Sequence, residues 1–205
     1  MSAIDAAVEA IRAGEPVILP TDTVYGLCAT PYTPDATERL YALKGRPGTQ
    51  PTALLARDVD MLFECVPELR GRAGPVVRAL LPGPYTLVLR NPARRFRWLT
   101  GTAPETIGVR VAELPGDAAA VLDRVGAIVA TSANLPGGPD PRRLEDVPAE
   151  ILTGAAAEID AGEVGGVPST VLDLTGREPR VLREGDVPAA EALGRVAAVL
   201  AGASA

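Results

Sequence analysis

The stretch Val17-Ile18-Leu19-Pro20-Thr21-Asp22-Thr23-Val24-Tyr25-Gly26-Leu27 joins an apolar run to a short, hydroxyl-rich segment. Its three leading aliphatic residues predict a buried β-strand that Pro20 ends. If Thr21-Asp22-Thr23 is extended, the two hydroxyls lie on one side and the Asp22 carboxylate on the other. Polar groups that a strand delivers at its end favour a binding site, although a capped turn is an equally good interpretation.

Helical and extended patterns alternate outward from this stretch. Apolar spacing predicts helices at residues 2–13, 34–44, 59–65, 115–124, 144–153 and 189–200, and a partly helical segment at 68–81 that Gly74-Pro75 interrupts. Apolar runs predict strands at residues 17–19, 52–56, 85–90, 106–111, 127–130, 158–160 and 170–174, with 181–182 pairing onto the last. Several strands are short and some are joined only by loops, which predicts an α/β fold with a twisted, mixed β-sheet flanked by helices.

The amino-acid composition excludes several kinds of catalytic site and metal site. The 205 residues include no histidine, which excludes Ser-His-Asp catalysis, Cys-His catalysis and histidine-ligated zinc sites. The two cysteines, Cys28 and Cys65, lack the spacing of a metal site, so we expect no metal ligated by the protein alone. The chemistry must use lysine, arginine, carboxylates, hydroxyls and amides, or a cation that a substrate brings.

Charge and hydropathy limit the partners. A net charge of −6 and an aromatic content of 3% argue against general nucleic-acid binding, which depends on phosphate neutralisation and base stacking. The basic and aromatic residues at 94–98 leave open a local contact with tRNA or double-stranded RNA. The sequence shows neither a signal-like N-terminus nor an apolar stretch of bilayer length, so we expect a cytoplasmic protein without a membrane segment.

Lys44-Gly45-Arg46-Pro47 follows a well-delimited helix. The hydroxyl of Thr33 is its predicted N-cap, and Gly45 is its predicted left-handed C-cap. Lys44 and Arg46 flank this glycine turn, so both cations can reach one polyanion. The alternative is that Lys44 only complements the helix dipole and Arg46 is solvated.

Thr131-Ser132-Ala133-Asn134 follows the predicted strand at 127–130. Ser132 and Asn134 are two residues apart, so an extended backbone would point both at one ligand. The alternative is a turn that opens the following loop.

Two arginines and one serine complete the polar candidates. Arg110 lies between two valines of a predicted strand, where its charge needs a carboxylate from the protein or from a ligand. Arg183 poses the same question near the C-terminus. Ser169 follows the glycine-rich loop at 162–168, whose backbone amides could form an anion cradle with the serine hydroxyl. The sequence contains neither a Walker A pattern nor a dinucleotide fingerprint.

Seven blocks in this order resemble the YrdC/TsaC family of threonylcarbamoyl-AMP synthases. They are Pro20-Thr21-Asp22-Thr23-Val24-Tyr25-Gly26-Leu27, Lys44-Gly45-Arg46-Pro47, Leu81-Pro82-Gly83-Pro84-Tyr85-Thr86-Leu87, Ile107-Gly108-Val109-Arg110-Val111, Thr131-Ser132-Ala133-Asn134, Pro168-Ser169-Thr170-Val171 and Leu182-Arg183-Glu184-Gly185. Each block is modestly specific, whereas seven in family order are highly specific. The resemblance implies a YrdC-like α/β sheet around a concave, positively lined cleft. Residues 1–205 would form a single domain without the second C-terminal domain of longer members.

The resemblance also implies an activity. Family members are nucleotidyltransferases that convert L-threonine, bicarbonate or CO2, and ATP accompanied by Mg²⁺ into L-threonylcarbamoyladenylate and pyrophosphate. A downstream transferase machinery then forms the t6A modification in tRNA. The implied partners are these substrates and that machinery, with at most a weak contact to tRNA.

Site residues are implied by the same resemblance. Lys44 and Arg46 would be the catalytic pair on the ATP phosphates. The remaining ATP-binding residues would be Thr106, Ser132, Asn134 and Arg183, and the threonine-binding residues Thr21, Thr23, Arg110 and Ser169.

Two departures from the family pattern define the alternatives. Many relatives carry a histidine in the strand after the Lys-x-Arg block, and Pro51-Thr52-Ala53-Leu54-Leu55-Ala56 has none. Gly83-Pro84-Tyr85-Thr86 resembles the paralogous YciO branch as much as the synthases. The alternatives are therefore a YciO-like paralogue with little synthase activity, or a tRNA or double-stranded RNA-binding module.

Overall fold

The computed structural model describes residues 2–165 and 167–202, so Gly166 of the predicted glycine-rich loop lies outside the described residues. Its helices are α1 Ala3–Arg12, α2 Pro34–Lys44, α3 Val59–Cys65, α4 Gly74–Leu80, α5 Gly116–Val125, α6 Ala149–Gly154 and α7 Ala189–Gly202. Its strands are β1 Val17–Pro20, β2 Tyr25–Ala29, β3 Ala53–Ala56, β4 Tyr85–Arg90, β5 Thr106–Val111, β6 Ala127–Ser132, β7 Ala157–Glu158, β8 Thr170–Asp173 and β9 Arg180–Arg183. Short 3-10 helices occupy Pro67–Arg70, Arg97–Leu99 and Leu144–Asp146.

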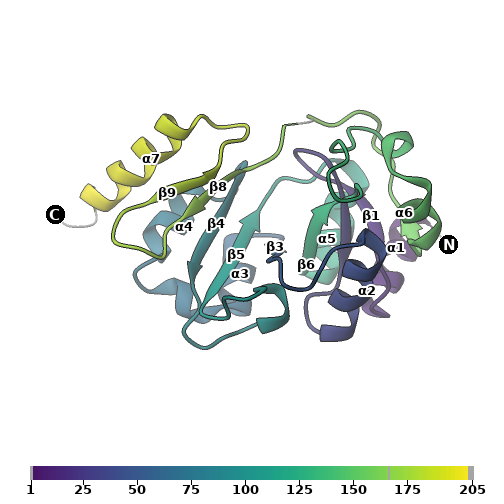
Figure 1. Cartoon of the computed structure of the whole chain (residues 1–205), viewed down its shortest axis with the longest axis horizontal. Helices are drawn as coiled ribbons and strands as arrows, with labels where there is room; N and C mark the ends of the chain where they lie inside the picture. Colours follow the sequence, from purple (N-terminus) through teal and green to yellow (C-terminus); the bar gives the residue numbers. More distant parts are fainter. Residues whose placement is uncertain (1, 166, 203–205) are drawn as a thin grey trace.

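The strands form one mixed sheet, which confirms the predicted fold class. Their order is β7-β1-β2-β6-β3-β5-β4-β8-β9 (Figure 1). The β7–β1, β3–β5 and β4–β8 pairs are parallel and the other neighbouring pairs are antiparallel. β2, β6, β3, β5 and β4 therefore lie side by side at the centre. They come from residues 25–132, and their order in the sheet differs from their order along the chain.

The two faces of the sheet are covered unequally. Alternation along the strands sends Ile18, Leu27 and Val109 into the larger core, to which α2, α3, α4 and α7 also contribute. Leu19 and Ile128 point to the opposite face, where α1 and α5 cover them in a smaller core. That second helical layer stops short of β4 and β8, which leaves part of the face for a cleft.

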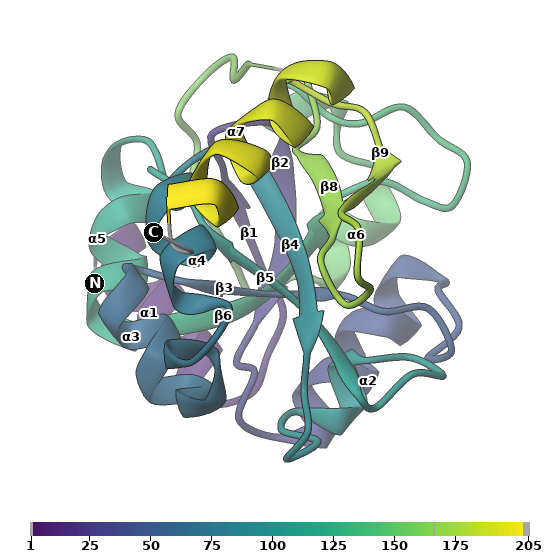
Figure 2. The ribbon, with the colours of Figure 1, turned by 90° about the vertical axis from the view of Figure 1, so that its left-hand side faces the viewer.

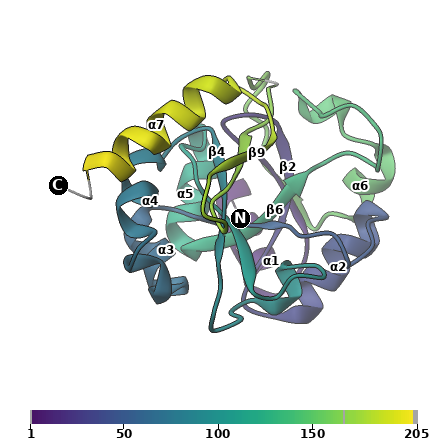
Figure 3. The same cartoon turned by 60° about the vertical axis from the view of Figure 1, so that its left-hand side comes forward.

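Two pairs of helices that contribute to the larger core lie apart from each other. Helix α7 packs on α4 through buried Ala192 and Val196, one helical turn apart, and lies beside β8 and β9 (Figures 1 and 2). Helices α2 and α6 contact each other, away from α3 and α4 (Figure 3). No helix within residues 2–165 and 167–202 combines the length and the apolar character that crossing a membrane needs.

Several local expectations were wrong. Strand β2 was not predicted, whereas Pro20 is the last residue of β1, paired with Tyr25, and so ends the strand as predicted. Thr33 occupies the N-cap of α2, but its hydroxyl makes no capping hydrogen bond. The partly helical segment at 68–81 is interrupted at residues 71–73, close to the predicted point, and Gly74-Pro75 begins α4, because proline suits the first helical turn.

The segment at 144–153 was predicted as one helix and is two. Pro148 separates a 3-10 turn from α6, because its ring cannot donate a hydrogen bond to a continuing helix. Strand β6 extends two residues beyond its predicted end and includes Ser132. This extension places the serine on the sheet, where it lines the site described next.

Candidate functional site

A cavity of about 580 Å³ lies on the part of the sheet that α1 and α5 leave uncovered. Its floor consists of small residues on four strands, Gly26, Ala53, Gly108 and Ala130. The register aligns Ala53 with Ala130 across β3 and β6, so both lie on one face. Larger side chains at these positions would fill the space that the cavity occupies.

Nine of the ten predicted site residues line this one cavity. They are Thr21, Thr23, Lys44, Arg46, Thr106, Arg110, Ser132, Ser169 and Arg183. The tenth, Asn134, is 9% exposed and lies behind Lys44, outside the lining. The sequence motifs therefore converge in space, although they span 163 positions of the chain from Thr21 to Arg183.

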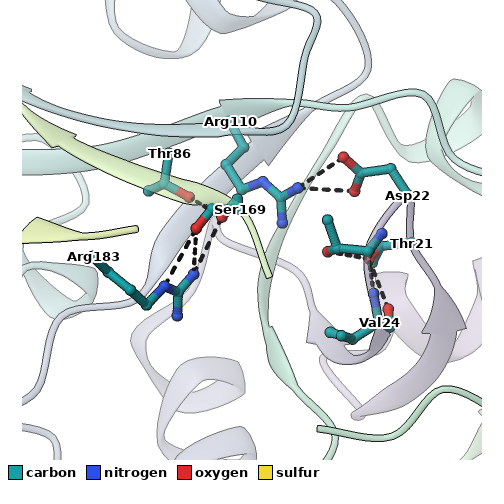
Figure 4. A network of polar contacts seen from close by, with 8 residues as sticks. Thr21, Asp22, Val24, Thr86, Arg110, Ser169 and Arg183 are labelled. Atoms are coloured by element: carbon teal, nitrogen blue, oxygen red, sulfur yellow. Dashed lines mark hydrogen bonds and ion pairs between the residues drawn. The ribbon is translucent and has the colours of Figure 1, made fainter. Parts of the chain in front are cut away.

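Thr21 holds the turn between β1 and β2. Its hydroxyl donates to the Val24 carbonyl at 2.7 Å and accepts from the amides of Thr23 and Val24 at 3.2 and 3.1 Å (Figure 4). This hydroxyl has one proton and two lone pairs, so these bonds use its capacity. The turn interpretation therefore holds for Thr21, and its hydroxyl has little left to offer a ligand.

The Thr23 hydroxyl is engaged in fewer hydrogen bonds than the Thr21 hydroxyl. The two hydroxyl oxygens lie 3.1 Å apart, and the Thr21 proton is already given to a carbonyl. Because two backbone amides also use the lone pairs of Thr21, this contact holds the Thr23 hydroxyl only weakly and leaves it available to a ligand in the cavity. A ligand amine or hydroxyl is the complement of such a group.

Arg110 forms an ion pair with Asp22. One terminal nitrogen, Nη2, donates to both carboxylate oxygens, at 2.8 and 3.1 Å (Figure 4). The side chains are 12% and 19% exposed, so water screens the pair only in part. Asp22 lines a neighbouring cavity of about 370 Å³, and Arg110 lines the larger one. The protein thus supplies the carboxylate that the sequence required, and Arg110 Nη1 makes no hydrogen bond within the described residues.

Lys44 is 6% exposed at the end of α2. Its ammonium donates to the Asn134 side-chain oxygen at 2.7 Å, to the Asn134 carbonyl at 2.9 Å and to the Ser132 carbonyl. It makes no ion pair with a carboxylate of the described residues. Burial, aided by the charge of Arg46, lowers the pKa of Lys44 from 10.5 to about 8. Lys44 is thus a buried positive charge without a carboxylate partner, and a bound anion would stabilise its protonated form.

Arg46, like Lys44, has no carboxylate partner among the described residues. Its Nη1 donates to the Thr131 hydroxyl at 3.0 Å and its Nη2 to the Pro51 carbonyl, while its guanidinium lies 5.9 Å from the Tyr41 ring centroid. Its Nε is buried without a hydrogen-bond partner in the described structure. Burial lowers the pKa of Arg46 as well. Both cations of the Lys-Gly-Arg motif therefore face the cavity without a carboxylate partner.

Asn134 acts through Lys44 and Ser132. Its side-chain oxygen accepts from Lys44 Nζ and from the Ser132 hydroxyl, each at 2.7 Å. Its nitrogen donates to the Gly138 carbonyl at 2.7 Å and to Asp140 Oδ1 at 3.3 Å. The amide thus fixes the lysine, the serine and the following loop relative to one another.

Ser169 and Arg183 form a second connected group. Arg183 Nη2 donates to the Ser169 carbonyl at 2.9 Å, and the Ser169 and Thr86 hydroxyls lie 2.9 Å apart (Figure 4). Gly185 permits this approach, because an added Cβ there would overlap the Pro168 carbonyl and the Ser169 backbone. Burial lowers the pKa of Arg183, and the charge of Arg110 adds to that effect.

Thr106 and three unpredicted polar residues also line the cavity. Thr106 donates to the Ala103 carbonyl at 3.1 Å and stands at the start of β5. Sequence reasoning assigned no site role to Thr86, Thr131 or Asp140, which line the cavity. Alternation in β4 offers a signal for Thr86, because it faces away from buried Tyr85 and Leu87. Asp140 lies in an irregular loop where periodicity gives no signal.

Four cationic side chains and several hydroxyls thus meet over a floor of small residues. Asp140 is the one carboxylate among the described residues that line the cavity. Such a site can bind a polyanion through lysine and arginine and a small polar molecule through hydroxyls. Its chemistry can therefore rest on positioning and charge.

Comparison with known proteins places this geometry in a family. A family model described as Sua5_yciO_yrdC, telomere recombination, matches residues 9–185. A threonylcarbamoyl-AMP synthase from Halorhodospira halophila is 37% identical over 84% of this chain and 90% of its own length.

Two solved structures support the same relation. Sua5 of P. abyssi in complex with L-threonine has a TM-score of 0.85 and 33% identity, covering 94% of this chain but 57% of the Sua5 chain. E. coli YciO has a TM-score of 0.78 and 30% identity, covering 90% of both chains. The sequence match, the shared fold and the converging motifs agree, and the chain belongs to the Sua5/YciO/YrdC family.

Proposed function

We propose that this chain is an L-threonylcarbamoyladenylate synthase, which uses L-threonine, bicarbonate or CO2, and ATP. The observation that carries the proposal is the single cavity in which nine residues from separate motifs meet. Named threonylcarbamoyl-AMP synthases at 32–42% identity, and a relative solved with L-threonine, support it. In this reading the enzyme is a cytoplasmic nucleotidyltransferase whose product passes to a t6A transferase machinery.

The reaction needs no protein nucleophile. The amine of threonine adds to CO2 and loses a proton, which forms a carbamate. A carbamate oxygen then attacks the α-phosphorus of ATP, and the bond to the bridging oxygen breaks to release pyrophosphate. Catalysis of this kind depends on holding the two ligands in line and on stabilising the negative charge of the phosphates.

The cations without carboxylate partners suit the phosphates. We assign Lys44 and Arg46 to the triphosphate, because each faces the cavity with charge that no described carboxylate neutralises. Ser132 and Arg183 line the nucleotide side together with Thr106. Asn134 then positions Lys44 and Ser132 through its own hydrogen bonds, without touching the nucleotide.

The hydroxyls suit the amino acid. We assign Thr23 to accept from the threonine amine or hydroxyl, and Ser169 to the carbamate side. Arg110 can meet the threonine carboxylate with Nη1, because only Nη2 is engaged by Asp22. Thr21 supports this wall by fixing the turn.

Pyrophosphate release tests the proposal. The full chain is mixed with ATP, Mg²⁺, bicarbonate and threonine, and we expect pyrophosphate only when threonine and bicarbonate are both present. Arg46→Met should reduce this rate about 100- to 1,000-fold if Arg46 stabilises the transition state. Arg39→Gln is the matched control, since Arg39 is half-exposed and pairs with Glu15 away from the cavity. Release that ignores threonine and bicarbonate, or a tenfold or smaller loss in Arg46→Met, would contradict the proposal.

A second candidate is a YciO-like paralogue with feeble synthase activity. The similarity to E. coli YciO over 90% of both chains favours it. The two candidates separate in one assay, because a synthase turns over ATP much faster with threonine and bicarbonate than without them. A paralogue with another role would show the same slow ATP hydrolysis in both conditions.

A further inference from the structure

Asp140 is an acidic residue in a cavity whose other charged lining residues are cationic. Among the described lining residues it is the one acid, and its carboxylate makes no ion pair with a described lysine or arginine. A bare carboxylate beside bound phosphates would repel them, which weakens binding of a triphosphate. A role for Asp140 in the site must therefore turn this repulsion into attraction.

The position of Asp140 is fixed by its neighbours. The Pro141 carbonyl accepts from the Tyr25 amide at 2.9 Å, which ties the loop to the start of β2. Asn134 Nδ2 donates to the Gly138 carbonyl at 2.7 Å and to Asp140 Oδ1 at 3.3 Å. Hydrogen bonds on both sides of Asp140 thus hold this part of the loop beside the cavity, and the bond from Asn134 reaches the carboxylate itself.

The same amide group links the carboxylate to the phosphate-binding lysine. Asn134 Oδ1 accepts from Lys44 Nζ at 2.7 Å, while its nitrogen contacts Asp140. Oδ1 of Asp140 is thus engaged, and Oδ2 makes no hydrogen bond within the described residues. The Asn134 carboxamide therefore accepts from Lys44, which we assign to phosphate, and donates to Asp140, whose Oδ2 makes no hydrogen bond within the described residues.

We propose that Asp140 Oδ2 binds the divalent cation that accompanies the triphosphate. This assignment rests on the proposed function, because the cation arrives with the nucleotide. Mg²⁺ in nucleotide sites characteristically uses one or two carboxylates, phosphate oxygens and several waters, so one carboxylate in this cavity is enough. The cation places positive charge between Asp140 and the phosphates and removes their repulsion. Lys44 and Arg46 then share the remaining phosphate charge.

Nucleotide binding with and without the metal tests this assignment. The full-length chain, Asp140→Asn and Asp35→Asn are titrated calorimetrically with ATP in excess Mg²⁺ and with ATP in excess EDTA. Asn keeps an oxygen to accept from Asn134 but loses the charge. Asp35 is exposed in the first turn of α2 and lies outside the cavity, so it is the matched control.

We expect Asp140→Asn to change the affinity for the Mg²⁺ complex of ATP and the affinity for metal-free ATP in opposite directions. Asp140→Asn should bind the Mg²⁺ complex of ATP at least tenfold more weakly and metal-free ATP at least threefold more tightly. Asp140→Glu should recover part of the affinity for the Mg²⁺ complex. With Mn²⁺ replacing Mg²⁺, the electron paramagnetic resonance spectrum of the ternary complex should change in Asp140→Asn and not in Asp35→Asn.

Other outcomes overturn the assignment in distinguishable ways. Tighter binding of both forms by Asp140→Asn would make Asp140 a counter-ion of Lys44 and Arg183 only. Equal binding by all three proteins would leave Asp140 no role toward the metal. If the unmodified chain binds ATP in neither condition, the proposed function fails, and the assignment fails with it.

Discussion

Binding of ATP should draw a proton onto Lys44. In the free protein, burial lowers the pKa of this lysine to about 8, and no described carboxylate forms an ion pair with it. A triphosphate in the cavity supplies that missing negative charge and should return the pKa toward 10.5. Uptake would then be about 0.1 proton at pH 7, about 0.5 at pH 8 and about 0.9 at pH 9. The full shift corresponds to roughly 3 kcal/mol of coupling between the proton and the nucleotide.

Calorimetry in paired buffers measures this uptake. The observed binding enthalpy is compared between two buffers of different ionisation enthalpy at pH 7, 8 and 9, for the unmodified chain and for Lys44→Arg. The arginine keeps a positive charge but does not titrate in this range. The uptake by Lys44→Arg therefore measures the protons taken up by ATP and by other groups, and it is subtracted from the uptake by the unmodified chain. Because a proton binds with ATP, affinity should also fall by up to tenfold per pH unit above pH 8.

Two results would refute this reasoning. One is an uptake that stays constant from pH 7 to pH 9, and the other is equal uptake by Lys44→Arg. The ligand-free protein offers a further check, because Lys44 binds fewer protons folded than unfolded between about pH 8 and 10.5. The contribution of Lys44 to the unfolding free energy should therefore rise with pH in that window. Lys44→Met should lack this rise.

Two threonines and one glycine among the residues that line the cavity give further predictions. Thr21→Val should lower the unfolding free energy in urea by about 2 kcal/mol, since it strands buried amides of the turn. Thr23→Val should leave stability nearly unchanged but weaken threonine binding about fivefold, the loss of one hydrogen bond of about 1 kcal/mol. Reversed behaviour of this pair would contradict the roles given to them. Gly108→Val should cut nucleotide or threonine affinity more than tenfold at almost constant stability, because its Cβ meets nothing closer than 3.7 Å and would occupy the cavity. Severe unfolding, or unchanged binding, would place the ligands elsewhere.

Elements with strong local signals could be predicted from the sequence. Strands β4 and β5 and helix α2 have the predicted bounds, because alternation or capping residues mark each end. Strand β2 was missed because Tyr25-Gly26-Leu27-Cys28-Ala29 is buried throughout and has no alternation. What makes it a strand is pairing with β1 and with distant β6, and no local pattern encodes such a partner.

The candidate site shows the same division between chemistry and geometry. Residue types and the order of the motifs identified ten candidates, and nine of them line one cavity. Which hydroxyl is free could not be predicted, because Thr21 and Thr23 differ only in the groups that surround them. Asn134 was placed at the ligand because its spacing from Ser132 suggested a common direction. The structure instead turns its amide toward Lys44 and Asp140.

The interleaved strand order has a consequence for how the cavity comes into being. Gly26 pairs with Ser132, and Tyr85 with Thr170, so its walls join parts of the chain that are synthesised far apart in time. Contacts of such long range form late in folding and make folding slow. A half-made chain therefore lacks the complete cavity, and a ligand that needs all its walls can bind only after the chain has closed. Nucleotide or threonine would then protect the whole domain against unfolding and proteolysis at once, instead of one region before another.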